Sequence, residues 1–317
     1  MKKTLKLLKQ SKKVALFSHT SPDPDTIGST LALAKALEKM GKSVELFCAE
    51  TIDKFEFLKC YDRYNTNAET DLQQFDLVVA VDVPESSMFC NFEQAFLSHQ
   101  NTLRIDHHKT GADYANHNLC VGYSACAILI FDILKKLKVK VDEDIATDLY
   151  FAICGDTGVF KNNNTDSVTF RVCADLLDAG ADFKKVYAEF FSKTSLDYIR
   201  LSSHILLNAE TNDEFGYAVL SLSKADSERL NPAQNENVSN LPHSYLNCGY
   251  KVAVILKEKD DGVHCSFRSK FEYDCTVIAG TFGGGGHKNA SGCLIEASFE
   301  DAQLKVKQAI EDYLKNI

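Results

Sequence analysis

Short apolar segments that alternate with longer segments of helical periodicity are the feature that most constrains the fold of this chain. The alternation predicts strands over Val14–His19, Ser43–Phe47, Asp76–Asp82 and Leu103–Asp106. It predicts helices over Thr26–Met40, Ser124–Leu137, Glu143–Cys154, Asp166–Ala179 and Phe183–Phe191. Residues 76–82 are nearly continuous in apolar side chains, which is typical of a central strand in a parallel sheet. We therefore expect an α/β domain with a mainly parallel sheet flanked by helices.

The second half of the chain has a different pattern. A helix is predicted over Leu196–Ala209, strands over Tyr217–Leu222, Lys251–Lys257 and Val263–Ser269, and a final helix over Phe299–Leu314. The length of 317 residues suits two domains better than one core. We expect an N-terminal domain in residues 1–190, a linker helix in 191–210, and a smaller C-terminal α/β domain with a glycine-rich loop in 211–317, with a cleft between the two domains.

Composition restricts the partners. The net charge of −9 argues against a long nucleic acid, because proteins that track phosphates carry basic surfaces. No apolar run approaches the ~18–20 residues that a membrane span needs, so we expect no membrane partner. The 11 cysteines are scattered without a CxxC pair, which fits neither a disulfide framework nor a zinc site. Free cysteines of this kind favour the reducing cytoplasm.

Four segments concentrate side chains that bind metal ions. They are the segment His19–Asp25, which includes Asp23, the single residue Asp82, the triplet Asp106–His108, and the segment Gly155–Gly158, which includes Asp156. Three of them follow predicted strands. Because ligands collect outside the carboxyl ends of parallel strands, these segments can converge although they are far apart in the sequence.

The donor set indicates which ions would bind. Carboxylates and imidazoles without thiolates suit Mn²⁺ or Mg²⁺ better than a structural zinc ion. Carboxylates near one another repel and resist ionisation unless cations compensate them. Two divalent ions about 3.5–4 Å apart would remove that repulsion and form a site that cleaves phosphoesters. Asp82, central at a strand end, is the candidate for the ligand shared by both ions.

Each segment except 106–108 also has a structural interpretation. Asp23 and Asp25, beside two prolines, can be turn residues, with Thr26 as the N-cap of the following helix. Asp82 can end its strand in a turn, and residues 155–158 can form a helix C-cap. Four segments at matching positions favour a metal site over separate structural roles.

Together these motifs resemble the DHH phosphoesterase superfamily, which is named after the triplet found here as Asp106-His107-His108. HTSPDPDTIGS, residues 19–29, is similar to the family motif His-x-x-x-Asp-x-Asp, Asp82 to the second motif, and GDTGVF, residues 155–160, to the fourth. The resemblance covers most of the first 165 residues. It implies a phosphoesterase with a two-metal site, usually manganese, with Mg²⁺ as the alternative ion.

The resemblance also implies residue roles. One ion would be held by His19, Asp23 and Asp82, and the other by Asp25, Asp82, His107 and Asp156. Asp106 would orient His107 or the metal cluster. His108 would face the phosphate and either stabilise its charge or help to protonate the leaving oxygen. A hydroxide activated by the two ions would attack phosphorus in line.

Residues 279–293, AGTFGGGGHKNASGC, form a further motif. Successive glycines leave amides free to face an anion, and a helix beginning directly after them would add a positive dipole. A flexible turn is the alternative. The segment resembles the DHH-associated C-terminal domain, with its Gly-Gly-Gly-His-x-x-Ala-x-Gly signature, although Ser291 stands where alanine is more usual. The resemblance implies a substrate site formed by Gly284, Gly285, Gly286, His287 and Arg268, whose guanidinium would grip phosphate. For Arg268, a solvated position on an edge strand is the alternative.

Within the superfamily, the chain is most similar to the nanoRNase/pAp phosphatase type. That resemblance implies a manganese-dependent exoribonuclease that hydrolyses very short RNA oligonucleotides to mononucleotides and dephosphorylates 3′-phosphoadenosine 5′-phosphate (pAp). Two alternatives stay open: a soluble phosphodiesterase for c-di-AMP or its linear product pApA, and a nucleotide-binding regulator without chemistry. Pairing of two copies through the DHH domain into a homodimer is also implied, although no residue pattern for it is visible.

Overall fold

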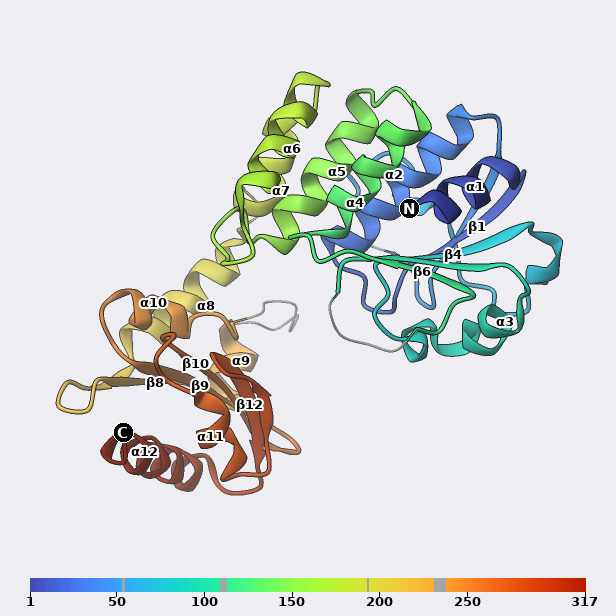
Figure 1. The fold of residues 1–317 in the computed structure, drawn as a ribbon. Coiled ribbons are helices and arrows are strands. Elements are labelled where there is room, and N and C mark those ends of the chain that lie inside the picture. The colour runs from blue at the N-terminus through green and yellow to red at the C-terminus, as the bar shows by residue number, and fades with distance from the viewer. Residues whose placement is uncertain (53–54, 109–112, 193, 231–237) are drawn as a thin grey trace. The chain divides into compact units, whose positions relative to one another are not determined.

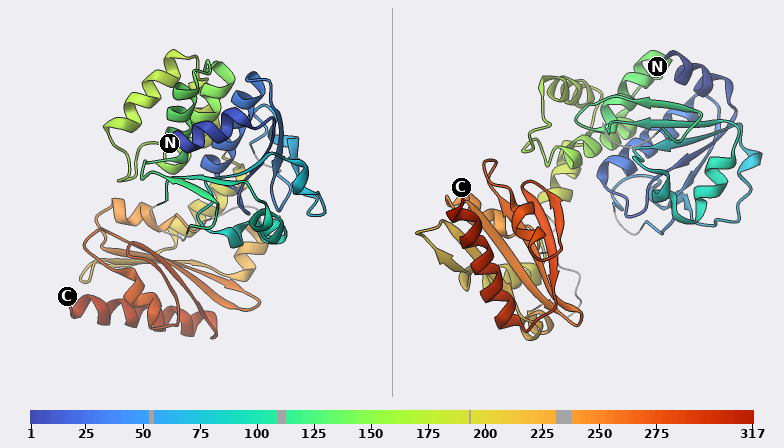
Figure 2. Two further views of the ribbon diagram at one scale, coloured as in Figure 1. Left: turned by 45° about the vertical axis from the view of Figure 1, so that its right-hand side comes forward. Right: turned by 60° about the horizontal axis from the view of Figure 1, so that its bottom comes forward.

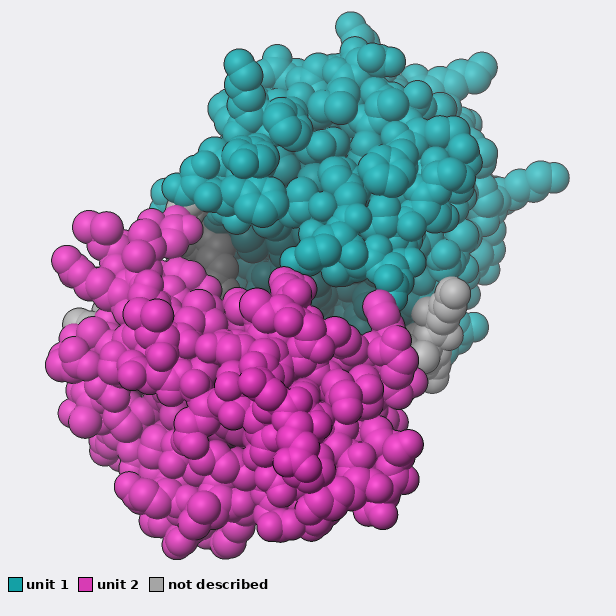
Figure 3. All heavy atoms as spheres, turned by 90° about the vertical axis from the view of Figure 1, so that its left-hand side faces the viewer, with its two compact units in different colours: residues 1–193 teal, residues 194–317 magenta. Residues whose placement is uncertain are grey.

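The computed structural model describes residues 1–52, 55–108, 113–192, 194–230 and 238–317. The chain divides into two compact units, residues 1–193 and 194–317, shown in teal and magenta in Figure 3. Each unit has its own sheet and its own hydrophobic cores.

Unit 1 is built on a six-stranded parallel sheet. Its strands are β1 (Lys13–Phe17), β2 (Ser43–Phe47), β3 (Tyr64–Asn65), β4 (Leu77–Val81), β5 (Thr102–Asp106) and β6 (His117–Cys120). They lie in the order β3-β2-β1-β4-β5-β6, and every neighbouring pair is parallel. From β1 to β3 successive strands are added toward one edge of the sheet, and from β4 to β6 toward the other edge. An open α/β sheet forms its ligand site where this direction changes, here between β1 and β4.

Helices cover both faces of this sheet (Figure 1). They are α1 (Lys2–Gln10), α2 (Pro24–Lys39), α3 (Glu93–Ser98), α4 (Cys126–Leu137), α5 (Glu143–Asp156), α6 (Ser167–Asp178) and α7 (Phe183–Phe191), with short 3₁₀ turns at Tyr61–Arg63, Leu72–Gln74 and Ser86–Phe92. Val14 and Leu16 of β1 face the aliphatic core with α2, α4 and α5, whereas Phe17 faces a core of phenylalanines beside α3. The alternation along one strand therefore fills both layers.

The close contact of α2 with α5 depends on a glycine. A Cβ on Gly28 would lie 2.4 Å from the carbonyl oxygen of Asp148 and 2.9 Å from the Cβ of Ala152. Further along the same contact, Lys35 Nζ donates to Asp148 Oδ2 at 2.6 Å, and both side chains are largely buried. Gly28 thus allows the approach, and the Lys35–Asp148 hydrogen bond spans it.

Unit 2 is built on a mixed six-stranded sheet with the order β11-β12-β10-β9-β8-β7. Its strands are β7 (Glu210–Asn212), β8 (Tyr217–Leu222), β9 (Val252–Lys259), β10 (Gly262–Ser269), β11 (Gly285–His287) and β12 (Ala290–Ile295). Helices α8 (Leu196–Leu207), α9 (Lys224–Leu230) and α10 (Pro242–Asn247) belong to one face, and α11 (Cys275–Gly280) and α12 (Phe299–Lys315) to the other (Figure 2). Only β8 and β9 pair in parallel among these described strands.

The predicted fold class is confirmed, with a parallel sheet flanked by helices and a second sheet domain. The glycine run is followed neither by a helix nor by a free turn, because Gly285–His287 pair with β12 as strand β11. The helix expected to link the domains is α8, whose Leu201 and Ile205 lie in a core of unit 2. Within the described ranges, no helix has the length and apolar character that spanning a membrane requires.

Candidate metal centre and active site

The candidate metal ligands of unit 1 lie at the carboxyl ends of three adjacent parallel strands. His19 follows β1, Asp82 follows β4, and Asp106, the last residue of β5, leads into the two histidines. Asp156 is the last residue of α5. The reversal of strand order between β1 and β4 brings these chain segments together.

The first motif turns from β1 into α2. Asp23 is the N-cap of α2, because its Oδ1 accepts a hydrogen bond from the Thr26 amide at 2.9 Å. The alternative interpretation named Thr26 as the cap and is wrong in that detail. His19 Nε2 lies 3.9 Å from Asp23 Oδ1, and its Nδ1 lies 2.7 Å from the Thr20 carbonyl oxygen. The capping carboxylate therefore also faces His19.

Asp25 is fully buried and is held by three hydrogen bonds. It accepts hydrogen bonds from the Cys126 amide at 2.5 Å, the Ala127 amide at 3.1 Å and Ser29 Oγ at 2.9 Å. The two amides are the first of α4, whose own N-cap residue Ala125 has no side-chain acceptor. Asp25 thus stabilises the N-terminus of α4. Its Oδ2 has further lone pairs and lies 3.8 Å from His107 Nε2.

Asp82 occupies the centre of the cluster in an uncommon conformation. Its φ angle is 59°, in the left-handed region, where a non-glycine residue is strained, and such strain is concentrated at functional sites. The side chain is 1% exposed, and within the described part of the chain its Oδ1 has no hydrogen-bond donor. An oxygen in this situation needs a positive partner.

His107 reaches three carboxylates from one nitrogen. Its Nδ1 lies 3.0 Å from the carbonyl oxygen of Tyr123, which can only accept, so Nδ1 carries the proton. Its Nε2 lies 3.2 Å from Asp156, 3.5 Å from Asp82 and 3.8 Å from Asp25. The Tyr123 carbonyl therefore leaves the Nε2 lone pair directed at the cluster, as a metal ligand requires.

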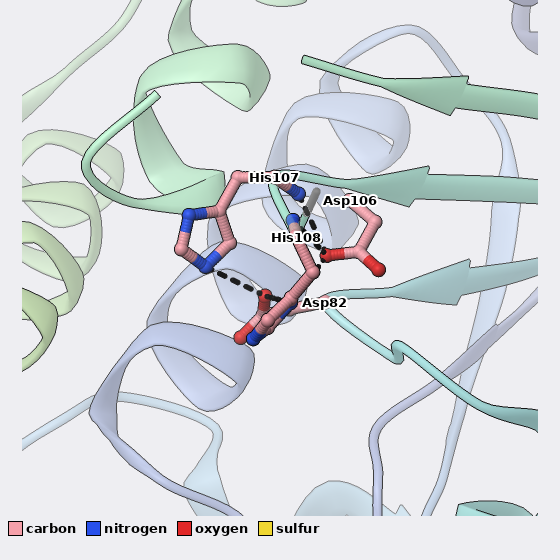
Figure 4. Close-up of side chains that lie close together, drawn as sticks. All are labelled: Asp82, Asp106, His107 and His108. Atoms are coloured by element: carbon pink, nitrogen blue, oxygen red, sulfur yellow. Dashed lines mark hydrogen bonds and ion pairs between the residues drawn. The ribbon is translucent and has the colours of Figure 1, made fainter. Parts of the chain in front are cut away.

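Asp106 holds His108 rather than the ring of His107 (Figure 4). Its Oδ1 accepts from His108 Nδ1 at 2.7 Å and from the amides of His107 and His108, and its Oδ2 accepts from the buried Arg104. Burial raises the pKa of Asp106, but these hydrogen bonds outweigh it and bring the pKa to about 2. The hydrogen bond with Asp106 in turn raises the pKa of His108.

These residues fit a pair of divalent cations. Ligand atoms within 4.8 Å of one another are offered by His19, Asp23 and Asp82 in one group and by Asp25, His107 and Asp156 in another. Burial, followed by the charges of neighbouring carboxylates, raises the pKa of both Asp25 and Asp82. Cations would relieve that repulsion and satisfy the Oδ1 of Asp82, and an oxygen and imidazole set suits Mn²⁺ or Mg²⁺.

Two asparagines outside the recognised motifs hold the backbone of Asp156. Asn164 Nδ2 donates to the Asp156 carbonyl at 3.1 Å and to the Ser124 carbonyl at 3.0 Å, while Asn162 Nδ2 donates to Asp156 at 3.2 Å. Ser124 follows Tyr123, so Asn164 joins the backbone of Asp156 to the segment that orients His107. The polar run KNNNT after GDTGVF was the available signal.

The candidate substrate residues of unit 2 lie in one row across the sheet. Ala290 of β12 pairs with Arg268 on one side and with His287 on the other, so all three point to the same face. The Arg268 guanidinium donates to the Phe267 carbonyl and to Asn240 Oδ1 at 3.2 Å. Burial and the charges of Lys259 and Arg268 lower the pKa of Lys257, a further cation that the motif analysis missed. The row is suited to an anion.

The glycine run lies at one end of this row. Gly284 accepts no side chain, because its Cβ would lie 2.2 Å from the carbonyl oxygen of Gly292. Gly283 and Gly286 have φ angles of 72° and 140°, which favour glycine. Ser291 donates to the Cys275 carbonyl at 2.7 Å and is buried, so the unusual hydroxyl is satisfied without changing the row.

Both units match family models. The DHH family N-terminal domain matches residues 13–153, and the DHHA1 domain matches residues 217–316. The bifunctional oligoribonuclease and PAP phosphatase NrnA of Thermus thermophilus is 27% identical over 304 residues, which cover 95% of this chain and 90% of the relative. The cyclic-di-AMP phosphodiesterase GdpP of Bacillus subtilis is 28% identical over 337 residues, covering 98% of this chain and 49% of GdpP.

A solved structure shares the fold of the whole chain. The exopolyphosphatase-related protein from Bacteroides fragilis aligns with a TM-score of 0.82 and 22% identity, covering 99% of this chain and 96% of that protein. Membership of the family rests on the two domain models and the curated relatives. The chain is therefore a DHH-family phosphoesterase that combines the DHH N-terminal domain with a DHHA1 domain.

Proposed function

We propose that this phosphoesterase is a manganese-dependent exoribonuclease that hydrolyses oligoribonucleotides of a few residues to mononucleotides and dephosphorylates pAp. The observation that carries the proposal is the convergence of carboxylates and imidazoles on Asp82, whose buried Oδ1 needs a cation. The relatives named oligoribonuclease and PAP phosphatase support the substrate class.

The proposed ligand sets draw on three overlapping side-chain groups of the structure, the third of which consists of Asp82, Asp106, His107 and His108. His19, Asp23 and Asp82 would hold one ion, and Asp25, Asp82, His107 and Asp156 would hold the other. When bound, the two ions supply positive charge that neutralises the phosphate and lowers the pKa of the attacking water. Asn164 and the Tyr123 carbonyl keep Asp156 and His107 in place for this task.

His108 is the proposed catalytic residue of the chain. Its Nδ1 donates to Asp106 Oδ1 at 2.7 Å, which fixes the ring and leaves Nε2 for the substrate. The ring side chain is 40% exposed, so a phosphate can reach it. A proton held at Nε2 would pass to the leaving oxygen, and Asp106, fixed by Arg104, would stabilise the imidazolium before that transfer.

Unit 2 is proposed to bind the nucleotide. Arg268 and His287 flank the small Ala290, so an anion can lie between a guanidinium and an imidazole. The glycine amides would add uncharged donors. Few cations take part, and the net charge of −9 opposes a long polyanion, so these residues suit a substrate with few phosphates.

Hydrolysis assays with a set of substrates test the proposal. The full chain is incubated with Mn²⁺ and end-labelled di- to pentaribonucleotides, pAp, or a 20-nucleotide RNA, and products are separated by chromatography. We expect mononucleotides from the short substrates and adenosine monophosphate from pAp, with little turnover of the long RNA. Absence of mononucleotide release, while calorimetry shows Mn²⁺ binding, would overturn the proposal. Asp82→Asn should abolish turnover, whereas the exposed Asp178→Asn is the matched control.

A second candidate is a phosphodiesterase for c-di-AMP or pApA. The observation that favours it is the 28% identity to the cyclic-di-AMP phosphodiesterase GdpP over 98% of this chain. A competition between pApA, c-di-AMP and a triribonucleotide at equal concentration separates the two functions. Preferred hydrolysis of c-di-AMP would select this second candidate.

A further inference from the structure

Two cysteines of unit 2 lie directly opposite each other on neighbouring strands. Cys265 of β10 pairs with Cys293 of the antiparallel strand β12, so both side chains point to the same face of the sheet. Both contact the core that α11 and α12 cover. Cys265 is buried, whereas Cys293 is partly exposed.

The geometry of this pair suits a disulfide. Residues directly opposite each other in an antiparallel pair have Cα atoms about 4.5–5.5 Å apart. Disulfides need a Cα separation of about 4.4–6.8 Å. The neighbouring Cys293 thiol and burial raise the pKa of Cys265, whereas the neighbouring Cys265 thiol lowers the pKa of Cys293. The more exposed Cys293 is therefore the thiol that reacts first.

The pair lies directly beneath the glycine run. A Cβ built on Gly284 would lie 2.5 Å from the Cβ of Cys293 and 2.9 Å from its Cα, closer than real atoms approach. The backbone of Gly284 therefore rests on Cys293 without free space. In the order β11-β12-β10, Cys265 lies on the other side of β12 from the glycine run, so closing a disulfide would draw the Cys293 Cβ away from Gly284 and remove the support under the amides that follow it.

We propose that Cys265 and Cys293 are a redox-sensitive pair that closes to a disulfide and weakens substrate binding at the glycine run. The Cys293 thiolate attacks a small disulfide, RSSR, forming a mixed disulfide and releasing RS⁻. Cys265 then loses its proton and displaces the second RS⁻ from Cys293. Two protein thiols are thereby oxidised by two electrons, and one RSSR is reduced to two RSH.

The expected effect follows from the change in the distance between the two Cβ atoms. Cross-strand Cβ atoms lie about 4.5–5.5 Å apart in a sheet, whereas a disulfide brings them to roughly 3.8 Å. Cys293 must therefore shift by about 1 Å while in contact with Gly284. The metal candidates all lie in unit 1, so the disulfide should change KM and leave kcat unchanged. This effect on binding rests on the proposed function of the glycine run.

Peptide mapping tests the disulfide itself. The full chain is equilibrated with oxidised glutathione, alkylated and digested with trypsin, which places Cys265, Cys275 and Cys293 on the separate peptides 260–268, 271–288 and 289–305. We expect a cross-link between peptides 260–268 and 289–305 that disappears in Cys293→Ser and Cys265→Ala. The exposed Cys248→Ser is the control that keeps it. A link through Cys275 instead, or none when Cys248 is fully modified, would overturn the proposal.

Kinetics and calorimetry test the consequence. Oxidation should raise the KM for a triribonucleotide, and the Kd for pAp, at least threefold, with kcat within twofold. Dithiothreitol should reverse the change, and Cys293→Ser should not show it. Equal KM and Kd values in both redox states would refute the effect on the glycine run. If the reduced wild type hydrolyses no short oligonucleotide, the proposed function fails, whereas the peptide map still decides whether the thiol pair forms.

Discussion

The replacement Asp82→Asn should have opposite effects on stability with and without metal. Asp82 is 1% exposed and its Oδ1 has no hydrogen-bond donor among the described residues. A buried polar group without a partner costs about 1–3 kcal/mol. Asparagine keeps the shape, cannot ionise and offers an amide to the carboxylates around it. We therefore expect the metal-free variant to be more stable than the wild type by about 1–3 kcal/mol.

Metal should reverse this order. At about one hundred times its Kd, an ion that binds only the folded state adds about 2.7 kcal/mol. The variant loses the ligand proposed to be shared by both ions and should gain much less. Calorimetric melting of wild type and variant in chelator and in Mn²⁺ measures the four stabilities, with roughly 2–4 °C for each kcal/mol in a unit of this size. Asp178→Asn replaces an exposed carboxylate of the same unit and should leave the stability unchanged both in chelator and in Mn²⁺.

The pH dependence provides a second measurement on the same variant. Burial and neighbouring carboxylates raise the pKa of Asp82 in the folded protein above its value in the unfolded chain. At pH values between the two, Asp82 keeps its proton in the folded protein and has lost it in the unfolded chain. The stability of the metal-free wild type therefore falls as pH rises, and the advantage of Asp82→Asn should grow from pH 5 to pH 8. The reasoning would be refuted by a variant that is less stable than wild type in chelator, or by one that Mn²⁺ stabilises as much as it stabilises the wild type.

Three further perturbations address single contacts. Burial raises the pKa of Asp148 to about 7. As pH rises from 4 to 7, the free energy of unfolding of the wild type should therefore fall by up to roughly 4 kcal/mol relative to that of Asp148→Asn, measured by urea titration without metal. Asn164→Asp removes the donor to Asp156 and should weaken Mn²⁺ binding in calorimetry about tenfold, whereas the adjacent Asn163→Asp should not. Arg268→Lys should raise the KM for pAp about tenfold with kcat unchanged, and equal KM values would exclude a bidentate contact.

Local patterns were sufficient to predict four of the six described strands of unit 1, namely β1, β2, β4 and β5. Residues 77–81 are apolar on both faces of the sheet, because β4 is central and covered twice, and this is visible without any partner strand. The strand His117–Cys120 was not predicted, since its four residues include a histidine and an asparagine at the sheet edge. Its place depends on pairing with β5, which the local sequence does not encode.

The glycine run shows a different limit. Its composition is compatible with a turn, an anion loop or a strand, and the choice depends on contacts with residues further along the chain. Gly285 and Gly286 pair with Gly292 and Ser291, and the absent Cβ of Gly284 allows it to rest on Cys293. A strand formed by small residues has no apolar alternation, so no periodicity could predict β11. The Tyr123 carbonyl is a similar case, because a backbone oxygen carries no residue signal.

The structural and the metal-binding interpretations of the acidic motif are not exclusive. Asp23 caps α2 and Asp25 accepts from the first amides of α4, so two helix N-termini stabilise carboxylates that also face the cluster. Asp106 is likewise satisfied by Arg104 and His108. Among the buried carboxylates of the cluster, Asp82 alone has an oxygen without a donor in the described chain. Unit 1 can therefore fold around most of its acidic residues before any cation binds, and the contribution of the ions to stability should be concentrated at Asp82.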